Sequence, residues 1–172
     1  LDLLGALTNT NGKLASAGTL LLKRASEINN QGGQLASQSL LTLFAGSLDN
    51  RNRGTVASNG ALAVTTTGAV QNSGDGLIYS QNADLKLKAA SLDNAKGSIQ
   101  SQTALNLEID KALDNQSGKV IAQAGDVNIT AATIDNRGGT LASLKGALQA
   151  KALGGLLRND FDLNNNRQAG II

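Results

Sequence analysis

A short motif of glycine, any residue and an aliphatic residue recurs along the chain at a nearly constant interval. Its seven glycines are Gly12, Gly33, Gly54, Gly76, Gly97, Gly118 and Gly139. The interval is 21 residues throughout, except for 22 residues between Gly54 and Gly76. A fixed period of this length is typical of solenoids, in which each repeat forms one turn of a coil.

Three further positions keep their place within each repeat. Two residues after the aliphatic position stands a small residue: Ser16, Ser37, Ser58, Ser80, Ser101, Ala122 and Ser143. An alternating apolar pair follows, such as Leu85 and Leu87. Each repeat then closes with an aliphatic residue, a polar residue and an asparagine: Asn9, Asn30, Asn50, Asn72, Asn94, Asn115 and Asn136. Apolar residues at period two indicate strands, so each repeat carries up to three short extended segments.

This pattern predicts an all-β parallel β-helix of about seven to eight turns, in which each strand lies on its counterpart in the next turn. Gly and Asn stand between the strands, where the chain turns and a positive φ is useful. The closing asparagines are expected to form an amide ladder along one corner. A leucine-rich repeat has a similar period, but it needs helical material, whereas stretches such as Ser58–Ala61 are turn sequences. The scarcity of aromatics, with two Phe, one Tyr and no Trp, suits a narrow aliphatic core.

The two ends of the repeat array are irregular. Leu1-Asp2-Leu3 resembles the middle of a preceding turn, so we interpret residues 1–172 as a single β-helix segment of a longer protein. The next glycine motif after Gly139 is at Gly170, 31 residues later. If 163–165 (Leu-Asn-Asn) closes the last repeat, an insertion or irregular loop falls at 152–162, and if 157–159 (Leu-Arg-Asn) closes it, the extra residues lie elsewhere. The insertion, which carries Phe161, is either an inert surface loop or a contact site.

The composition limits the chemistry. Without Cys or His, the usual transition-metal sites and the Cys- or His-based nucleophiles are excluded. A net charge of +2 without a basic run argues against nucleic acid as a partner, and no apolar stretch is long enough for a membrane span. We therefore expect no cofactor and no bound metal.

A few outward side chains are weak candidates for a site. An acidic column, Asp49, Asp93, Asp114 and Asp135, is interrupted by Gln71 and could attract a cation such as calcium, but Asp in a turn more often binds local backbone N–H groups. Outward Tyr79 could contact a sugar. Outward Lys86 and Lys88 form a small basic spot on what is more simply a solvated face.

Two elements of the repeat together resemble a known family. They are the aliphatic-Asp-Asn element and the Gly-x-aliphatic-x-Ser element, both present in the segment Leu92-Asp93-Asn94-Ala95-Lys96-Gly97-Ser98-Ile99-Gln100-Ser101. From Leu1 to about Ala150 the chain is similar to the filamentous haemagglutinin repeats of bacterial two-partner-secretion exoproteins, which include adhesins and contact-dependent growth inhibition toxins of the CdiA type. The resemblance implies a right-handed parallel β-helix, exported through an outer-membrane partner transporter to the cell surface or the medium.

Three functions compete for such a chain. The first is a structural stalk segment that presents adhesive or toxic regions to other cells. The second is a direct adhesion module that binds a glycan or protein receptor on a host or neighbouring bacterial cell. The third is a polysaccharide-cleaving β-helix enzyme, which would need clustered acids in a groove built by longer loops. The sequence shows no such cluster, so we expect no enzymatic activity.

Overall fold

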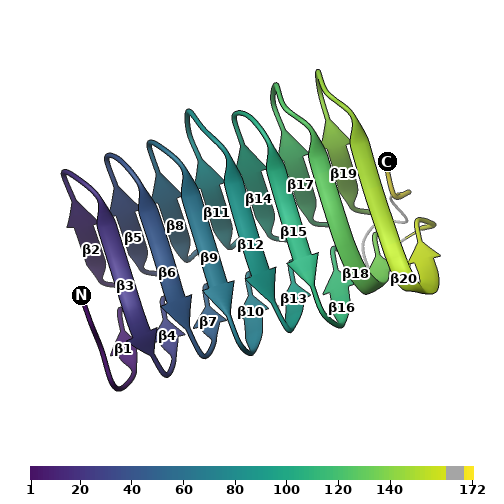
Figure 1. Cartoon of the computed structure of the whole chain (residues 1–172). Helices are drawn as coiled ribbons and strands as arrows, with labels where there is room; N and C mark the ends of the chain where they lie inside the picture. Colours follow the sequence, from purple (N-terminus) through teal and green to yellow (C-terminus); the bar gives the residue numbers. More distant parts are fainter. Residues whose placement is uncertain (162–168) are drawn as a thin grey trace.

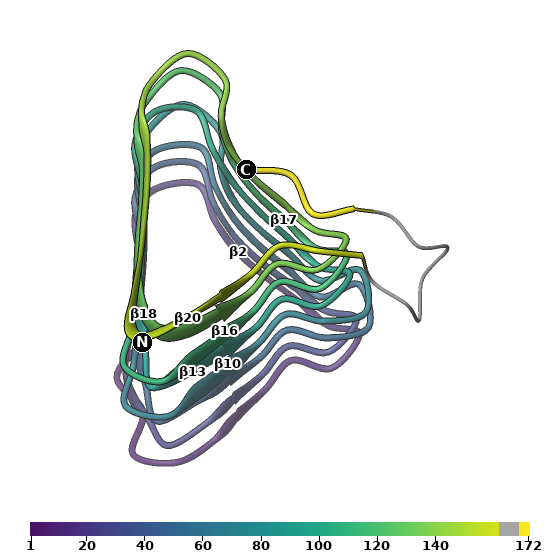
Figure 2. The same cartoon turned by 90° about the vertical axis from the view of Figure 1, so that its right-hand side faces the viewer.

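The structure is a computed structural model that describes residues 1–161 and 169–172. In these residues the chain forms twenty β-strands and no helix. The strands wind into a coil that advances along one axis from the N-terminal to the C-terminal end (Figure 1). Viewed from the C-terminal end in Figure 2, the chain turns counter-clockwise as it approaches the viewer. The coil is therefore a right-handed parallel β-solenoid, as the repeat and the resemblance predicted.

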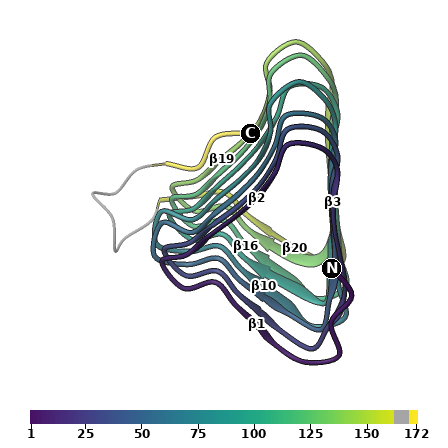
Figure 3. The ribbon, with the colours of Figure 1, turned by 90° about the vertical axis from the view of Figure 1, so that its left-hand side faces the viewer.

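Each turn has three sides, which give the coil a triangular outline in both end views (Figures 2 and 3). The first face is a seven-stranded sheet made of β2 (Lys13–Ser16), β5 (Gln34–Ser37), β8 (Thr55–Ser58), β11 (Leu77–Ser80), β14 (Ser98–Ser101), β17 (Lys119–Ala122) and β19 (Thr140–Ser143). The second face contains β3 (Leu20–Ala25), β6 (Leu41–Ala45), β9 (Leu62–Thr66), β12 (Leu85–Ala89), β15 (Leu105–Ile109) and the first parts of β18 (Val127–Asp135) and β20 (Leu148–Arg158). The third face contains β1 (Leu7–Thr8), β4 (Ile28–Asn29), β7 (Leu48–Asp49), β10 (Ala69–Gln71), β13 (Ser91–Asp93), β16 (Ala112–Asp114) and the last parts of β18 and β20.

Every strand pairs in parallel with its counterpart one turn away. In the first face Ile78 pairs with Ile99, and in the third face Leu92 pairs with Leu113. The register follows from the inward side chains, because a slip of one residue would move every apolar side chain to the solvent side. The glycine motif therefore marks the same structural position in every turn.

The core is a set of aliphatic columns inside the coil. It consists of Leu, Ile, Val and Ala side chains contributed by all three faces, and no aromatic side chain belongs to it. Three columns run through Ile78 of the first face, Leu85 of the second and Leu92 of the third, each no more than 1% exposed. A coil of three short sides encloses a narrow interior, and branched aliphatic side chains of similar size fill it.

The small residue of each repeat lies at the corner between the first and second faces. The hydroxyls of Ser37 and Ser80 donate hydrogen bonds to backbone carbonyls of the preceding turn at 2.7 and 2.8 Å. The hydroxyl of Ser101 donates to the carbonyl of Thr103 in its own turn at 2.7 Å. Each of these side chains is at most 4% exposed. A buried hydroxyl that satisfies turn carbonyls explains why a small polar residue recurs here.

The C-terminal turn differs from the loop expected at 152–162. Residues as far as Arg158 belong to β20, which pairs with β18 across a bulge where Ala131 and Thr133 face Ala152 and Leu156. Leu157 pairs with Ile134, so 157–159 rather than 163–165 takes the closing position. The segment 163–165 lies outside the described residues.

Gly170 resumes the repeat, because Ile171 after it bridges to Thr140. The closing asparagine precedes the next glycine by 3 residues between Asn136 and Gly139 but by 11 between Asn159 and Gly170. Most of the additional length thus follows Asn159 instead of interrupting the strand before it.

Candidate functional site

The closing asparagines line the corner between the third and first faces. In each turn the amide nitrogen donates to the amide oxygen of the next asparagine at 2.6–2.8 Å, from Asn9 through to Asn159. The same nitrogen also donates to a backbone carbonyl of the next turn, for example from Asn94 to Lys119 at 3.1 Å. The six asparagines from Asn30 to Asn136 are 0% exposed. Within residues 1–161 and 169–172, no buried side-chain nitrogen or oxygen lacks a hydrogen-bond partner.

The motif glycines stand beside this ladder because nothing larger fits there. A Cβ at Gly97 would lie 2.1 Å from the carbonyl oxygen of Asn72 and 2.6 Å from the amide oxygen of Asn94. A Cβ at Gly33 or Gly139 would likewise lie 2.0 or 2.1 Å from a backbone carbonyl oxygen. The glycine therefore lets two turns approach closely enough for the amides to bond.

The positive φ expected near these turns lies one residue before each glycine. The residues there have φ between 53° and 67°: Asn11, Gly32, Arg53, Asp75, Lys96, Ser117 and Gly138. The seven motif glycines themselves are not among the residues with positive φ. The left-handed conformation is thus carried by a non-glycine residue in five of the seven turns.

The acidic column lies on the third face, with each carboxylate next to the ladder. Asp93 pairs with Asp114, and Asp114 pairs with Asp135. Each carboxylate accepts the backbone N–H of the residue two positions on, at 2.9–3.2 Å. Asp49, beyond Gln71, makes the same bond with Arg51. These aspartates therefore hold the turn that leads into the ladder.

Arginines neutralise the two ends of the column but not its middle. Burial favours the neutral acid at Asp135, but the hydrogen bonds and charge of Arg137 outweigh it and lower the pKa of Asp135. Asp49 is held in the same way by Arg51, and its pKa is also lowered. Burial raises the pKa of Asp114, and the neighbouring charges of Asp93 and Asp135 add to that effect. The column can carry charge, but in the described part of the chain no three His, Cys, Asp or Glu side chains are placed to hold a metal ion.

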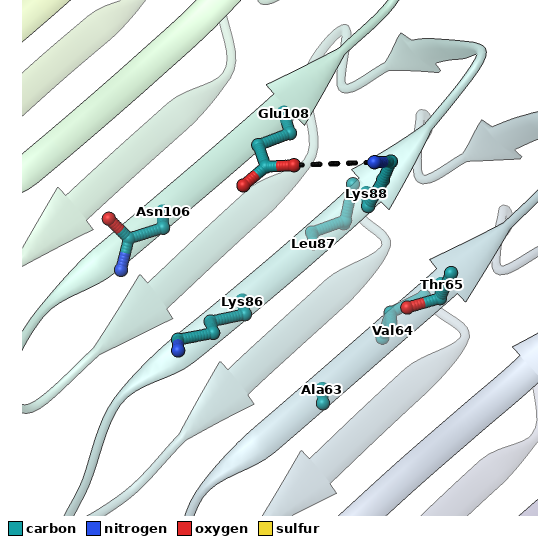
Figure 4. A pocket seen from close by; sticks show the side chains of 8 residues that line it. All are labelled: Ala63, Val64, Thr65, Lys86, Leu87, Lys88, Asn106 and Glu108. Carbon is teal, nitrogen blue, oxygen red and sulfur yellow. Dashed lines mark ion pairs between the residues drawn. The ribbon is translucent and has the colours of Figure 1, made fainter.

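The basic spot lies in a shallow hollow on the outward side of β9, β12 and β15 (Figure 4). The ammonium group of Lys88 is 3.6 Å from the carboxylate of Glu108, and both side chains are more than half exposed. An exposed ion pair of this kind contributes little. Ala63 on β9 is short, whereas Lys86 beside it on β12 and Asn106 on β15 are longer, which leaves the surface lower at Ala63. The surface has the features of a solvated sheet face.

Tyr79 and Phe161 occupy different parts of the coil. Tyr79 is on the outward side of β11 and lines a second shallow hollow on the first face. Phe161 is 56% exposed at the C-terminal end, where it bridges to Ala169. The structure does not bring the aspartates, the lysines and Tyr79 together, because they lie on three different faces. In the part of the chain that is described, no helix is long and apolar enough to cross a membrane.

From the sequence alone, Asn159 was only an alternative candidate for the closing asparagine of the last turn. Its amide oxygen accepts from Asn136 at 2.7 Å, so the ladder extends by one turn. The signal that could identify it is the preceding Leu157, which stands where Ile134 stands one turn earlier.

In the residues that the structure describes, a continuous ladder, short loops and separated polar groups define a β-solenoid of uniform turns. The chain belongs to the haemagglutinin repeat family, whose model matches residues 4–78, 76–117 and 106–166. Proteins of this family are secreted surface filaments associated with two-partner secretion, and the family is one of structural and adhesive proteins, not of enzymes. No curated protein and no solved structure matches the chain.

Proposed function

We propose that the chain is a stalk segment of a secreted bacterial surface filament, and that it holds adhesive or toxic regions away from the cell that displays it. The observation that carries this proposal is the unbroken ladder from Asn9 to Asn159, which joins every turn to the next. Each turn advances the coil by roughly 4.8 Å, the spacing of paired strands. A rod built in this way acts through its length and stiffness.

Export requires a partner under this proposal. An outer-membrane transporter would pass the unfolded chain, and the coil would form outside, turn upon turn, as nearest-neighbour contacts accumulate. The absence of cysteine suits a chain that crosses a membrane unfolded, because no disulfide can form on the way. A receptor on a host or neighbouring bacterial cell would then meet the presented region and not the rod.

A deletion in the full-length filament tests the stalk role. Removing residues 97–117 takes out one complete repeat and joins Lys96 to Gly118, so the faces and the ladder stay in phase. Surface display of the region beyond the rod, measured by antibody binding on intact cells, should persist. The control removes residues 98–107, about half a turn, and should abolish display because the later turns no longer align.

Two results would contradict the stalk role. One is normal display after the half-turn deletion, which would show that continuity of the rod is not needed. The other is loss of target-cell contact after the full-turn deletion although the shortened filament is displayed, which would mean that residues 97–117 themselves make the contact.

A further inference from the structure

Tyr79 is the only tyrosine of the chain, and it lies in a hollow without charge. The hollow is on the outward side of β5, β8 and β11, which are neighbours in the first face. Glutamine, asparagine, serine and alanine side chains surround the tyrosine, and no charged residue lines the hollow. Its chemistry therefore differs from that of the basic spot and of the acidic column.

Tyr79 stands next to an unusually well buried alanine of the same face. Its partner in the preceding turn is Ala57, which is 7% exposed although it points outward and is not part of the aliphatic core. The corresponding alanine of the preceding turn, Ala36, is half-buried, and Ala15, in the first strand of this face, is exposed. We attribute the extra cover of Ala57 to the large side chain next to it. Tyr79 itself is half-buried, as expected of a ring that packs over Ala57 with one face and meets the solvent with the other.

Amide side chains with unused hydrogen-bonding capacity surround this half-buried ring. In the described structure the side-chain amides of Gln34, Gln38 and Gln81 have no hydrogen bond within the protein, although all three line the hollow. Asn59 is oriented by Asn82, whose amide nitrogen donates to its oxygen at 2.6 Å. The nitrogen of Asn59 then remains a donor. A small site therefore combines an aromatic face with amide donors and acceptors.

We propose that the Tyr79 hollow binds a neutral oligosaccharide. The C–H face of a sugar ring would pack on the ring of Tyr79, and the amides of Gln34, Gln38 and Gln81 would bond its hydroxyls. The absence of charged lining residues selects an uncharged sugar over a sulfated or sialylated one. The alanines of the earlier turns leave room for the sugar chain to continue along the rod. This property goes beyond a stalk, because it gives the rod's flank a ligand of its own.

The chain offers a direct readout, because Tyr79 is the only tyrosine and there is no tryptophan. Cellotetraose, maltotetraose, chitotetraose and a neutral N-acetyllactosamine tetrasaccharide would each be titrated into the purified chain while tyrosine emission is recorded. A heparin-derived tetrasaccharide is the charged comparison. At least one neutral sugar should give a saturable change in emission, and the heparin fragment should give none. Calorimetry would measure the same affinities in the variants.

Three variants distinguish binding in the Tyr79 hollow from nonspecific binding elsewhere on the coil. Tyr79→Ala should weaken binding of the neutral sugar by about tenfold or more. Ala36→Arg, two strands away from Tyr79 in the first face, should weaken it similarly because the large side chain fills the hollow. Phe44→Ala removes a 45% exposed aromatic side chain from the second face and should leave binding unchanged. Circular dichroism would confirm that each variant keeps its strands.

Three results would overturn the proposal. They are saturation by the heparin fragment alone, neutral-sugar affinity that survives Tyr79→Ala, and no binding of any neutral sugar at millimolar concentration. A failure here leaves the stalk role intact, since the deletion experiment does not depend on a ligand.

Discussion

At the scale of single residues, the asparagine of each turn bonds in both directions along the coil. The amide of Asn94 accepts from Asn72 at 2.8 Å and donates to Asn115 at 2.7 Å and to the carbonyl of Lys119 at 3.1 Å. A side chain that is 0% exposed can be tolerated only because all of these bonds are made. One asparagine thus ties three successive turns together.

Asn94→Ala should lower the free energy of unfolding by about 2–4 kcal/mol, because it leaves one buried donor and one buried acceptor unpaired. Urea denaturation followed by circular dichroism would measure the change. Asn128→Ala is the matched control. Asn128 is exposed on β18 and makes one bond of 3.2 Å with Asn106, so its replacement should change stability by less than about 0.5 kcal/mol. An equal loss of unfolding free energy in the two variants would show that the ladder contributes no more to stability than an exposed hydrogen bond.

The residue before each motif glycine carries backbone strain. Lys96 is exposed and has a φ of 58°, a conformation that costs an L-residue roughly 1–2 kcal/mol. Lys96→Gly should therefore raise the free energy of unfolding by about 0.5–1 kcal/mol, after the greater freedom of glycine in the unfolded chain is subtracted.

Lys86→Gly provides the control for that substitution. Lys86 is an exposed residue of β12, where glycine should lower stability by about 0.5–1 kcal/mol. Thermal unfolding of both variants would show the opposite signs. If Lys96→Gly is as harmful as Lys86→Gly, the strain at the turn is not significant.

At the scale of elements, the third face places like charges next to one another. Asp114 lies between Asp93 and Asp135 in adjacent strands, and its bonds come from its own turn through Gln116 and not from a cation. Like charges opposite each other in a sheet are destabilising. Gln71 interrupts the column between Asp49 and Asp93, which limits the same repulsion further along the face.

Asp114→Asn should stabilise the chain at neutral pH by about 0.2–1 kcal/mol, because it removes the middle charge and keeps an oxygen for the turn. The pKa of Asp114 is raised by burial and by its acidic neighbours, so its ionised form is disfavoured in the folded chain. That penalty is present above the folded pKa and disappears as the pH falls below the usual range of aspartate. The difference in free energy of unfolding between Asp114→Asn and the parent chain should therefore decrease as the pH falls. Urea denaturation at several pH values across this range would measure it.

Asp135→Asn should behave in the opposite way. The pKa of Asp135 is lowered because Arg137 outweighs the effect of burial, so its stabilising contribution is present at neutral pH and is lost as the pH falls through the folded pKa. The variant should thus be less stable than the parent chain at neutral pH and similar to it in acid. Two variants with the same pH profile would contradict this account of the column.

The strands were predictable from the sequence, but two details of the elements were not. The period and the alternation of apolar residues predicted the three faces, the parallel register and the aliphatic core. The closing element of the last turn was ambiguous, because 157–159 and 163–165 both read as Leu, a polar residue and Asn, and only the pairing of Leu157 with Ile134 decides between them. The burial of Ala57 beside Tyr79 depends on a residue of another turn, and no local pattern encodes such a neighbour.

At the scale of the whole molecule, the coil behaves as a one-dimensional array. Each turn touches only the turns before and after it, so its stability is the sum of its own contribution and two interfaces. The interior side chains follow this arrangement. Leu85 and Leu92, in the middle of the rod, are at most 1% exposed, whereas Leu7, Leu14 and Leu148, toward the ends, are only partly buried. A rod of equivalent repeats is therefore not equally stable along its length.

Hydrogen exchange should show this gradient in the isolated chain. The backbone amides of β9 and β12 should exchange most slowly, because opening them requires the loss of two interfaces, and those of β3 and β20 should exchange earlier. Mass spectrometry of peptides from each turn would measure the order. In Asn94→Ala, exchange should accelerate most in the turns beside Asn94, β12 and β15, since coupling runs between neighbours. Uniform protection along the rod, with uniform acceleration in the variant, would instead indicate one all-or-none unit and would exclude nearest-neighbour coupling as the source of the rod's stability.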